Sequence, residues 1–373
     1  MPTEYVWLDA DKEFRSKVRI LNEWVFEHGH QTVPTWNYDG SSTNQATTGD
    51  SEVILHPCFV CDHPLWPRCK TGGRPALVLC DTRYANGKPT LSNTRFGASK
   101  IFEMAPSARP WYGFEQEYFT TAAPFNNTRS VRYDSNLGKS YCGVGQDKVY
   151  GRHIAESHMQ ACLDAGLTLS GINAEVAPGQ WEFQIGPVEG IRAADQLVVA
   201  RFLLERIAEK NDVAVILHPK PFHDQNGSGC HTNYSTEETR NGTWHESTGY
   251  PGKKKTGLSV IMEQIKRLEK NHLAHMEVYG KDNEHRMTGT HETAAYDIFT
   301  SGVGDRSASV RIGNDTAREK KGYYEDRRPA SNCDPYMVAS LILQTTVINV
   351  DTEENTTPDV ISSPSQVNVA VEL

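Results

Sequence analysis

Alternating apolar and polar residues mark the first part of the chain as β-rich. Four short segments have the pattern of strands: residues 5–9, 14–21, 50–55 and 76–81. The pattern predicts that the first two pair as antiparallel neighbours. Asn86-Gly87 is a strong turn signal that closes this region. The sequence therefore predicts a small β-rich domain over residues 1–85, with little helix.

Beyond this boundary, helical and strand patterns alternate. Helical spacing of apolar residues occurs in residues 95–105, 150–165, 193–210, 258–278 and 336–350. Strand patterns lie at residues 111–119, 167–172 and 213–217. We therefore expect a larger α+β or α/β domain over residues 86–350. The last segment, residues 351–373, bears Thr, Ser and Pro, and predicts a mobile tail.

The predicted strand at residues 111–119 carries two carboxylates on one face. Successive side chains of a strand point to opposite faces, so Glu115 and Glu117 share a face, about 7 Å apart. Phe114 and Tyr118 share the other face. Two neighbouring carboxylates repel each other, and burying them unpaired is costly. The pair therefore indicates either a solvated face or a bound cation, and the flanking aromatic residues argue weakly against the solvated face.

Further acidic residues occur in later β-like segments. Glu182 lies in an otherwise apolar strand, while Glu175, His231 and Glu325 lie in other short segments. Oxygen ligands suit hard divalent cations such as Mg²⁺ or Mn²⁺, and Mn²⁺ also accepts an imidazole nitrogen. A zinc site would more often use cysteine and several histidines. The pattern thus favours Mg²⁺ or Mn²⁺ over zinc.

One cysteine-containing segment resembles half of a zinc knuckle. It contains Cys58, Cys61, His63 and Cys69. Prolines crowd the segment and no second cysteine pair follows it. We expect a surface loop here instead of a zinc site.

Composition narrows the class of protein. The formal net charge is −9 and the pI is near 5.9, which argues against nucleic acid as the main partner because such proteins carry basic patches. No secretory signal pattern and no apolar run of ~20 residues is visible, so we expect no membrane partner. The eight cysteines then read as reduced thiols. These features predict a soluble protein of the cytoplasm.

Arginines gather in the last third of the chain, at positions 286, 306, 311, 327 and 328. Arginine grips carboxylates and phosphates through two parallel hydrogen bonds. Surface ion pairs are the alternative, because they account for most arginines. Together with acidic metal ligands, the cluster suggests phosphoryl chemistry. The sequence has no Walker loop and no protein-kinase signature, so any nucleotide site would be of another kind.

An ordered set of motifs gives the chain a family resemblance. They are DGSST (39–43), FEQEY (114–118), NAEV (173–176), WEFQIGP (181–187), NGSGCHTN (226–233), HET (291–293), RSASVR (306–311) and EDRRP (325–329). Each motif is weak alone, but the ordered set resembles glutamine synthetases of the short, eukaryotic-type class (type II). The resemblance runs from about Tyr5 to about Leu343.

This resemblance implies a fold and a reaction. The fold would be α+β, with a small N-terminal β-grasp-like domain and a large catalytic domain built on a curved antiparallel sheet. The enzyme would be a ligase that joins ammonium to L-glutamate using ATP, giving L-glutamine, ADP and phosphate through γ-glutamyl phosphate. Phosphorylation fits the chemistry, because a carboxylate is a poor acylating agent.

The resemblance also implies ligands for two divalent cations. Glu115, Glu175 and Glu182 would hold one cation near glutamate, and Glu115 with His231 and Glu325 would hold the other near the ATP phosphates. Glu117 would bind a cation directly or support a residue that does, and ranks below Glu115.

Substrate-binding residues follow in the same way. Gly227, Arg286, Arg306 and Arg327 would contact glutamate and the transferring phosphoryl group, with Arg327 catalytic, and Arg311 would contact the nucleotide phosphates. The remaining ATP contacts would be Trp111, Asn233, Ser235, Arg240 and Tyr323. Glu292 would lie in a flap that closes over the intermediate and excludes water.

The ammonium site would involve a second subunit. Asp50, with Glu52 as second choice, would bind ammonium and remove its proton. In the family, the small N-terminal domain, which bears these residues, completes the active site of the neighbouring subunit in a ring. The resemblance thus implies a homodecamer of two stacked five-membered rings, and isolated chains should be inactive.

Some features depart from the family pattern. The loop at residues 125–136 differs from commoner forms, Gly313 stands where proline is usual, and the tail has no counterpart. A ligase for an amine larger than ammonium is one alternative; Asp50 and residues 39–42 favour ammonium. A non-catalytic binding or structural member is another, but it would have lost metal ligands, and all are present.

Overall fold

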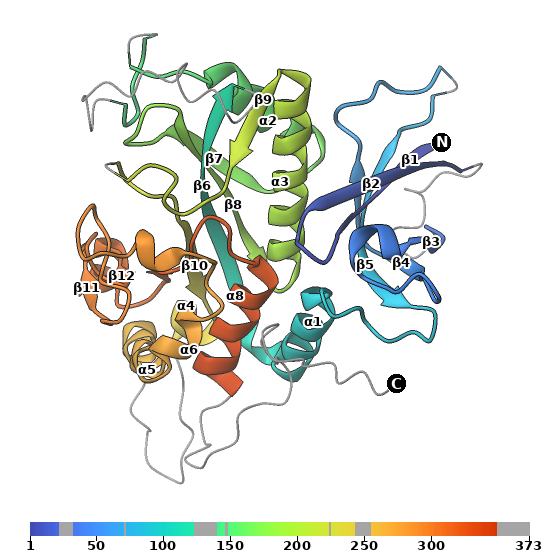
Figure 1. Cartoon of the computed structure of the whole chain (residues 1–373). Helices are drawn as coiled ribbons and strands as arrows, with labels where there is room; N and C mark the ends of the chain where they lie inside the picture. Colours follow the sequence, from blue (N-terminus) through green and yellow to red (C-terminus); the bar gives the residue numbers. More distant parts are fainter. Residues whose placement is uncertain are drawn as a thin grey trace, which may run out of the picture.

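The computed structural model describes residues 1–21, 33–70, 72–122, 140–145, 148–223, 225–242 and 255–348. It contains two β-sheets and a set of helices (Figure 1). The mixture of helices with mainly antiparallel sheets confirms the α+β class. The predictions for the loop at residues 125–136 and for the tail at residues 351–373 lie outside the described residues.

The smaller sheet is built from the N-terminal part of the chain. Its strands are β1 (Pro2–Leu8), β2 (Phe14–Ile20), β3 (Trp36–Asp39), β4 (Glu52–Asp62) and β5 (Ala76–Tyr84), in the order β2-β1-β5-β4-β3. The predicted antiparallel pairing of the first two strands is confirmed, while β1 and β5 run parallel. Tyr5, Trp7, Leu55 and Val78 are buried together as a small core. The four predicted strands are all present, and β3 was not predicted.

The larger sheet holds eight strands. They are β6 (Trp111–Ala122), β7 (Leu169–Ala174), β8 (Gln180–Glu189), β9 (Val213–Ile216), β10 (Cys230–Ser235), β11 (Ser301–Val303), β12 (Val310–Ile312) and β13 (Tyr324–Asp326). The order is β11-β12-β13-β10-β6-β8-β7, and β9 also pairs with β6. Among the described pairings of this curved sheet, β11 with β12 is parallel and the others are antiparallel. Strand β6 is thus an interior strand that pairs with β10, β8 and β9.

Helices flank this sheet. They are α1 (Thr94–Met104), α2 (Arg152–Asp164), α3 (Arg192–Lys210), α4 (Glu237–Asn241), α5 (Gly257–Lys270), α6 (His272–Met276), α7 (Asn314–Glu319) and α8 (Pro335–Leu343). Arg201 of α3 is buried and donates through Nε to Gln116 Oε1 of β6 at 2.7 Å. The face of β6 that carries Gln116 therefore lies against α3.

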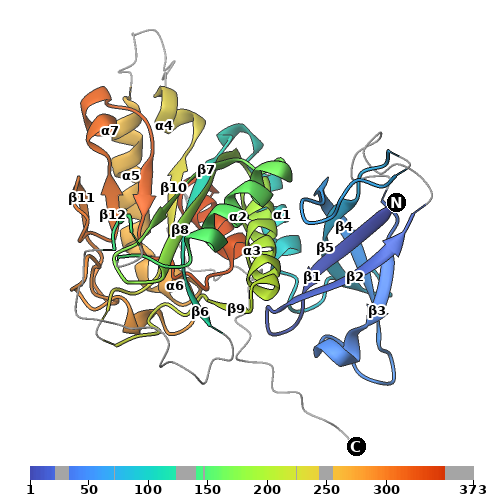
Figure 2. The ribbon, with the colours of Figure 1, turned by 90° about the horizontal axis from the view of Figure 1, so that it is seen from above.

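The smaller sheet packs on the outer side of α3. Arg206 of α3 forms an ion pair with Glu4 of β1 at 2.8 Å, and Phe202 of α3 meets the ring of Phe14 edge-on at 5.6 Å. Figure 2, like Figure 1, shows α3 between the two sheets. The smaller sheet therefore lies on the α3 side of the larger sheet, and the face of β6 that points away from α3 lies on the other side.

Three expectations about local structure were wrong in part. The helix predicted at residues 258–278 is divided at Asn271, whose side-chain amide donates to the carbonyl of Arg267 and ends α5. The helix predicted at residues 336–350 ends at Leu343 and continues as a π-helical turn, Gln344–Ile348. The Cys58 to Cys61 segment is not a surface loop, because β4 runs through it with a bulge between Pro57 and Phe59. None of the described helices is long and apolar enough to span a membrane.

Candidate active site

The site begins with the two faces of β6. Phe114, Gln116 and Tyr118 are buried at 0–1 % exposure on the α3 side. Glu115 and Glu117 therefore point to the opposite face, as the alternation predicted. Both line a polar cavity of about 60 Å³ on that face.

Strand register brings further ligand-type residues beside these two carboxylates. Glu117 of β6 lies opposite Glu182 of β8, and Glu115 lies opposite His231 of β10. Strand β13 pairs with the other edge of β10, where Glu325 lies opposite Asn233. Asn233 follows His231 by two positions, so it shares a strand face with that histidine. Residues far apart in the sequence thus meet across adjacent strands.

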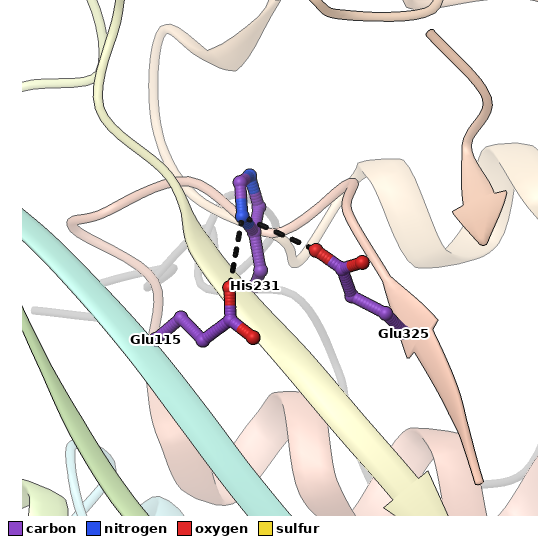
Figure 3. Close-up of side chains that lie close together, drawn as sticks. All are labelled: Glu115, His231 and Glu325. Carbon is purple, nitrogen blue, oxygen red and sulfur yellow. Dashed lines mark ion pairs between the residues drawn. The ribbon is translucent and has the colours of Figure 1, made fainter. Parts of the chain in front are cut away.

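Two clusters result. In the histidine cluster (Glu115, His231 and Glu325), His231 Nδ1 is 3.6 Å from Glu115 Oε2 and 3.5 Å from Glu325 Oε1 (Figure 3). The acidic cluster consists of Glu117, Glu175 and Glu182. In each cluster the three potential ligand atoms lie within 4.8 Å of one another. The sequence interpretation placed Glu115 with Glu175 and Glu182 as ligands of one cation; in the structure, the carboxylate that clusters with Glu175 and Glu182 is that of Glu117.

The acidic cluster is electrostatically strained when only protein groups surround it. Burial, and then the charges of Glu175 and Glu182, raises the pKa of Glu117 well above its usual range. Burial, and then Glu115 and Glu175, raises the pKa of Glu182 to about 8. Three carboxylates whose oxygen atoms lie this close together fit a hard divalent cation.

In the histidine cluster, arginines compensate part of the negative charge. Burial, reinforced by the charge of Arg327, holds the pKa of His231 well below its usual range, so its imidazole is neutral and able to coordinate a cation. Glu325 is held by two guanidinium groups: Arg327 Nη1 lies 2.7 Å from Oε1 and Arg311 Nε lies 2.5 Å from Oε2. Two carboxylates with one neutral imidazole also fit a divalent cation.

The arginines of the sequence cluster divide into two groups. Arg286, Arg306, Arg311 and Arg327 line the polar cavity. Arg328 points away, because residues alternate along this segment, and its Nη2 pairs with Asp326 Oδ2 at 2.7 Å in a fully buried ion pair. Arg328 is therefore a structural residue, and four arginines remain for an anionic ligand.

Those four arginines differ in environment. Burial lowers the pKa of Arg286 to about 10 despite the nearby Glu117. For Arg306, burial lowers the pKa, but Glu292 and the other acidic neighbours outweigh it and the net shift is upward. Arg327 Nε is buried and has no hydrogen-bond partner among the described residues.

A glycine and a short loop complete the polar cavity. A Cβ on Gly227 would lie 2.3 Å from the carbonyl oxygen of Pro219 and 2.5 Å from Arg286 Cγ, so only glycine fits there. Glu292 is exposed and has a left-handed backbone with φ +61°. Its carbonyl accepts a hydrogen bond from Arg327 Nη2 at 3.3 Å. The loop that bears Glu292 thus borders the arginines.

A second, more open cavity of about 440 Å³ adjoins the first. The five side chains expected to contact ATP apart from Arg311 all line it: Trp111, Asn233, Ser235, Arg240 and Tyr323. The guanidinium of Arg240 stacks on the Trp111 ring at 4.2 Å and donates to Ser235 Oγ at 2.9 Å. Glu115 lines both cavities, so they meet at this residue.

Asp50 does not belong to this site within one chain. It lies in the smaller sheet's region, just before β4, and lines neither of these cavities. Asp50 and Glu52 are both exposed, and Glu52 also accepts a hydrogen bond from Asn37. Because α3 and the larger sheet stand between the smaller sheet and the polar cavity, a chain cannot place its own Asp50 there.

Sequence reasoning gave no role to several amide residues at the site. Gln180 lines the polar cavity, and Asn173 and Gln184 form hydrogen bonds with acidic residues there. Asn173 precedes Glu175 by two positions, and Gln180 and Gln184 flank Glu182 at the same spacing. That period of two was the available signal, since it places them on the same strand face as the carboxylates.

Two ligand clusters, four arginines and an adjoining open cavity define a metal-dependent enzyme that acts on anionic substrates. The family model described as glutamine synthetase, catalytic domain, matches residues 103–368. A putative glutamine synthetase of Acanthamoeba polyphaga mimivirus is 51 % identical over 92 % of this chain and 93 % of that protein. The cytosolic glutamine synthetase isozyme of Daucus carota is 46 % identical over 92 % of this chain and 94 % of that protein.

The glutamine synthetase of Hebeloma cylindrosporum is 45 % identical over 93 % of each chain. The chain belongs to the glutamine synthetase family, which confirms the resemblance seen in the sequence. It is a glutamate–ammonia ligase: it joins ammonium to L-glutamate at the expense of ATP, and it uses a divalent metal.

Proposed function

We propose that the ligation proceeds through γ-glutamyl phosphate, formed where the two cavities meet. The observation that carries this proposal is the position of Glu115, which lines both cavities. ATP in the open cavity would direct its γ-phosphoryl group past Glu115 towards glutamate in the polar cavity. A glutamate carboxylate oxygen then forms a bond to phosphorus as ADP leaves. Ammonia attacks the acyl carbon, and phosphate leaves.

Each cluster would hold one divalent cation, either Mg²⁺ or Mn²⁺. The ligands would be Glu117, Glu175 and Glu182 for one cation, and Glu115, His231 and Glu325 for the other. This assignment moves Glu117 into the set of direct ligands. When bound, such cations neutralise charge on phosphoryl and carboxylate oxygens.

The arginines would orient the anionic groups. Arg286, Arg306 and Arg327 would contact glutamate and the transferring phosphoryl group, and the free Nε–H of Arg327 supports its place among them. Gly227 allows the backbone to approach glutamate closely. Arg311 would contact the nucleotide phosphates.

The open cavity would bind the rest of ATP. Its volume of about 440 Å³ is large enough for an adenosine group, and Trp111, with Arg240 stacked on it, offers an aromatic surface. Asn233, Ser235 and Tyr323 would provide polar contacts. The Glu292 loop would close over the polar cavity and exclude water, which otherwise hydrolyses an acyl phosphate.

A second copy of the chain would supply the ammonium site. The exposed carboxylate of Asp50 lies away from its own polar cavity, and in a ring it would enter that of a neighbour. There it would hold ammonium and accept its proton. We propose a homodecamer of two stacked five-membered rings, in which each chain has a small domain (1–85) and a catalytic domain (86–350). The named cytosolic relatives favour a cytoplasmic location.

Mixing two inactive variants tests the shared site. Asp50→Ala should disable the small domain's contribution, and Glu325→Gln should disable the catalytic domain's. Co-assembly should restore about a quarter of the sites, because some interfaces then combine two intact halves. Glutamine formation by the mixture measures this. A mixture as inactive as its parents, although mixed oligomers are present, would contradict the shared site.

The reaction route is tested by phosphate release from ATP with Mg²⁺. We expect release to require glutamate, and to give glutamine with ammonium and γ-glutamyl hydroxamate with hydroxylamine. Positional oxygen exchange in ATP, induced by glutamate without ammonium, would identify the acyl phosphate. Exchange can be seen only under conditions in which the terminal phosphate of bound ADP rotates freely. Glutamine formation without exchange under those conditions would argue against the intermediate. Turnover with a larger amine but not ammonium would indicate a related ligase.

A further inference from the structure

Every carboxylate of the acidic cluster accepts a hydrogen bond from an uncharged side-chain amide. Gln180 Nε2 donates to Glu117 Oε2 at 3.3 Å, and Asn173 Nδ2 donates to Glu175 Oε1 at 2.8 Å. Gln184 Nε2 donates to Glu182 Oε1. Three amides therefore match three carboxylates.

Two of these amides are joined to each other. Gln184 Nε2 also donates to Asn173 Oδ1 at 2.8 Å. A continuous chain of hydrogen bonds thus runs from Glu182 through Gln184 and Asn173 to Glu175. The two carboxylates cannot change orientation independently while this bridge is intact.

The backbone of two paired strands places the bridge. Asn173 of β7 lies opposite Glu182 of β8, and Gly171 lies opposite Gln184. A Cβ on Gly171 would lie 2.5 Å from Gln184 Oε1, so this glycine leaves the space that the Gln184 amide occupies. The bridge is therefore a feature of the local packing as well as of the side chains.

Neutral amides donate to all three carboxylates of this cluster but to only one of the two in its neighbour, where Glu115 accepts from Asn233 Nδ2 at 2.8 Å. In the histidine cluster, Glu325 is held by the cationic side chains of Arg311 and Arg327. A guanidinium orients a carboxylate but also neutralises its charge. An amide N–H orients one lone pair and leaves the charge and the remaining lone pairs for a cation.

We propose that Asn173 and Gln184 are positioning residues for the metal site of the acidic cluster. Their bridge sets the spacing and rotation of Glu175 and Glu182 without reducing the negative charge that attracts the cation. This inference rests on the proposed function, in which the acidic cluster binds a divalent cation. Neither amide needs to touch the cation or a substrate for this role.

The test measures Mn²⁺ binding by the intact oligomeric enzyme, using paramagnetic resonance of free Mn²⁺. Gln184→Met keeps the length of the side chain and removes the donors. Asn173→Leu does the same at the other end of the bridge. We expect each to weaken one class of Mn²⁺ site by roughly 10–100-fold, the usual effect of losing a residue that orients a ligand. The affected class should be the one that Glu182→Gln also removes.

Gln160→Met is the matched control. Gln160 also donates an amide hydrogen bond to a carboxylate, Asp164 Oδ1 at 2.8 Å, but on the exposed surface of α2. This variant should bind Mn²⁺ like the wild type.

Selective weakening separates positioning from general loss of structure. Equal weakening of both classes of site would overturn the proposal, as would wild-type Mn²⁺ affinity in both bridge variants. Wild-type enzyme that bound Mn²⁺ only at the histidine cluster would remove the proposed metal site of the acidic cluster, and this inference with it. Wild-type binding at both clusters with unaffected bridge variants would refute the positioning role alone.

Discussion

The two ligand clusters lie side by side on one sheet, yet they are built differently. The acidic cluster has three carboxylates and neutral amide donors, and burial and mutual repulsion raise the pKa values of its glutamates. The histidine cluster has a neutral imidazole, and two arginines compensate Glu325. Arg286 and Arg306 offset only part of the upward pKa shifts of Glu117 and Glu175, so a cation can supply the positive charge that the acidic cluster still needs. In the histidine cluster, Arg311 and Arg327 already supply part of that charge. We therefore expect tighter cation binding at the acidic cluster.

The comparison is tested most strongly by removing one ligand from each cluster. Glu117→Gln should abolish one class of Mn²⁺ site and Glu115→Gln the other. Each should reduce glutamine formation by more than about 100-fold, since losing a ligand costs more than losing its support. Mn²⁺ titration and an activity assay measure both effects. Glu103→Gln, which changes an exposed carboxylate on α1, is the control.

The alternative assignment gives a different result in the same experiment. If Glu115 served both cations, as the sequence alone suggested, Glu115→Gln would weaken both classes and Glu117→Gln would weaken neither strongly. That outcome would contradict the partition of ligands seen in the structure.

A substitution at Glu292 tests whether the polar cavity and the open cavity have separate roles. We predict that Glu292→Ala leaves nucleotide binding intact, because Glu292 lines only the polar cavity. Glutamine formation should fall by roughly 100-fold, since the loop would no longer protect the intermediate. ADP binding and turnover are measured on the same preparation. Unchanged turnover would refute the role of this loop.

The compensating arginines can be tested at Arg311. Arg311→Gln removes a cation 2.5 Å from Glu325 Oε2. The histidine cluster should then resemble the acidic cluster and bind Mn²⁺ roughly 10-fold more tightly, because repulsion of the bound cation is lost. The KM for ATP should rise at the same time. Weaker Mn²⁺ binding in this variant would show that Arg311 serves mainly to orient Glu325.

The smallest expected effect is on stability and its dependence on pH. The pKa of Glu182 is raised to about 8 in the folded state, against about 4.3 in an unfolded chain. The folded, metal-free protein therefore binds more protons, and its stability should decrease as pH rises from about 4.5 to 8. Added Mn²⁺ should reverse this trend above pH 7. Thermal unfolding with and without Mn²⁺ measures it, with expected shifts of about 2–4 °C.

In Glu182→Gln the pH-dependent difference between metal-free and metal-loaded protein should shrink. A metal-free protein that became more stable over this pH range, with Glu182 intact, would contradict the electrostatic account.

Strand periodicity explains which parts of the site could be predicted from the sequence. The alternation in β6 placed Glu115 and Glu117 on one face, and the same rule put Glu325 of β13 and Arg327, just after this strand, on one face. Periodicity cannot say which strands are neighbours or in what register. The division of the six ligands into two clusters depends on Glu117 lying opposite Glu182 and Glu115 opposite His231. Those pairings join residues more than sixty positions apart.

Errors in the predicted elements have equally specific causes. The prolines around Cys58 suggested a loop, but the bulge between Pro57 and Phe59 lets β4 continue past Pro57 to Asp62. The periodic pattern at residues 258–278 runs through Asn271, whose side chain competes for a backbone carbonyl and ends the helix. Arg328 was counted with Arg327 in the arginine cluster of the sequence, yet the alternation along the segment places it in the core. Local hydrogen bonds and strand pairing thus decide what periodicity leaves open.

The most direct test of the two-cluster account is anomalous diffraction at the manganese edge from crystals of the enzyme with Mn²⁺ and ADP. We predict two separate peaks in each active site. One should lie among the carboxylates of Glu117, Glu175 and Glu182, and the other among Glu115, His231 and Glu325. A single peak, or a peak that shares Glu115 with Glu175 and Glu182 while Glu117 stays apart, would contradict the account.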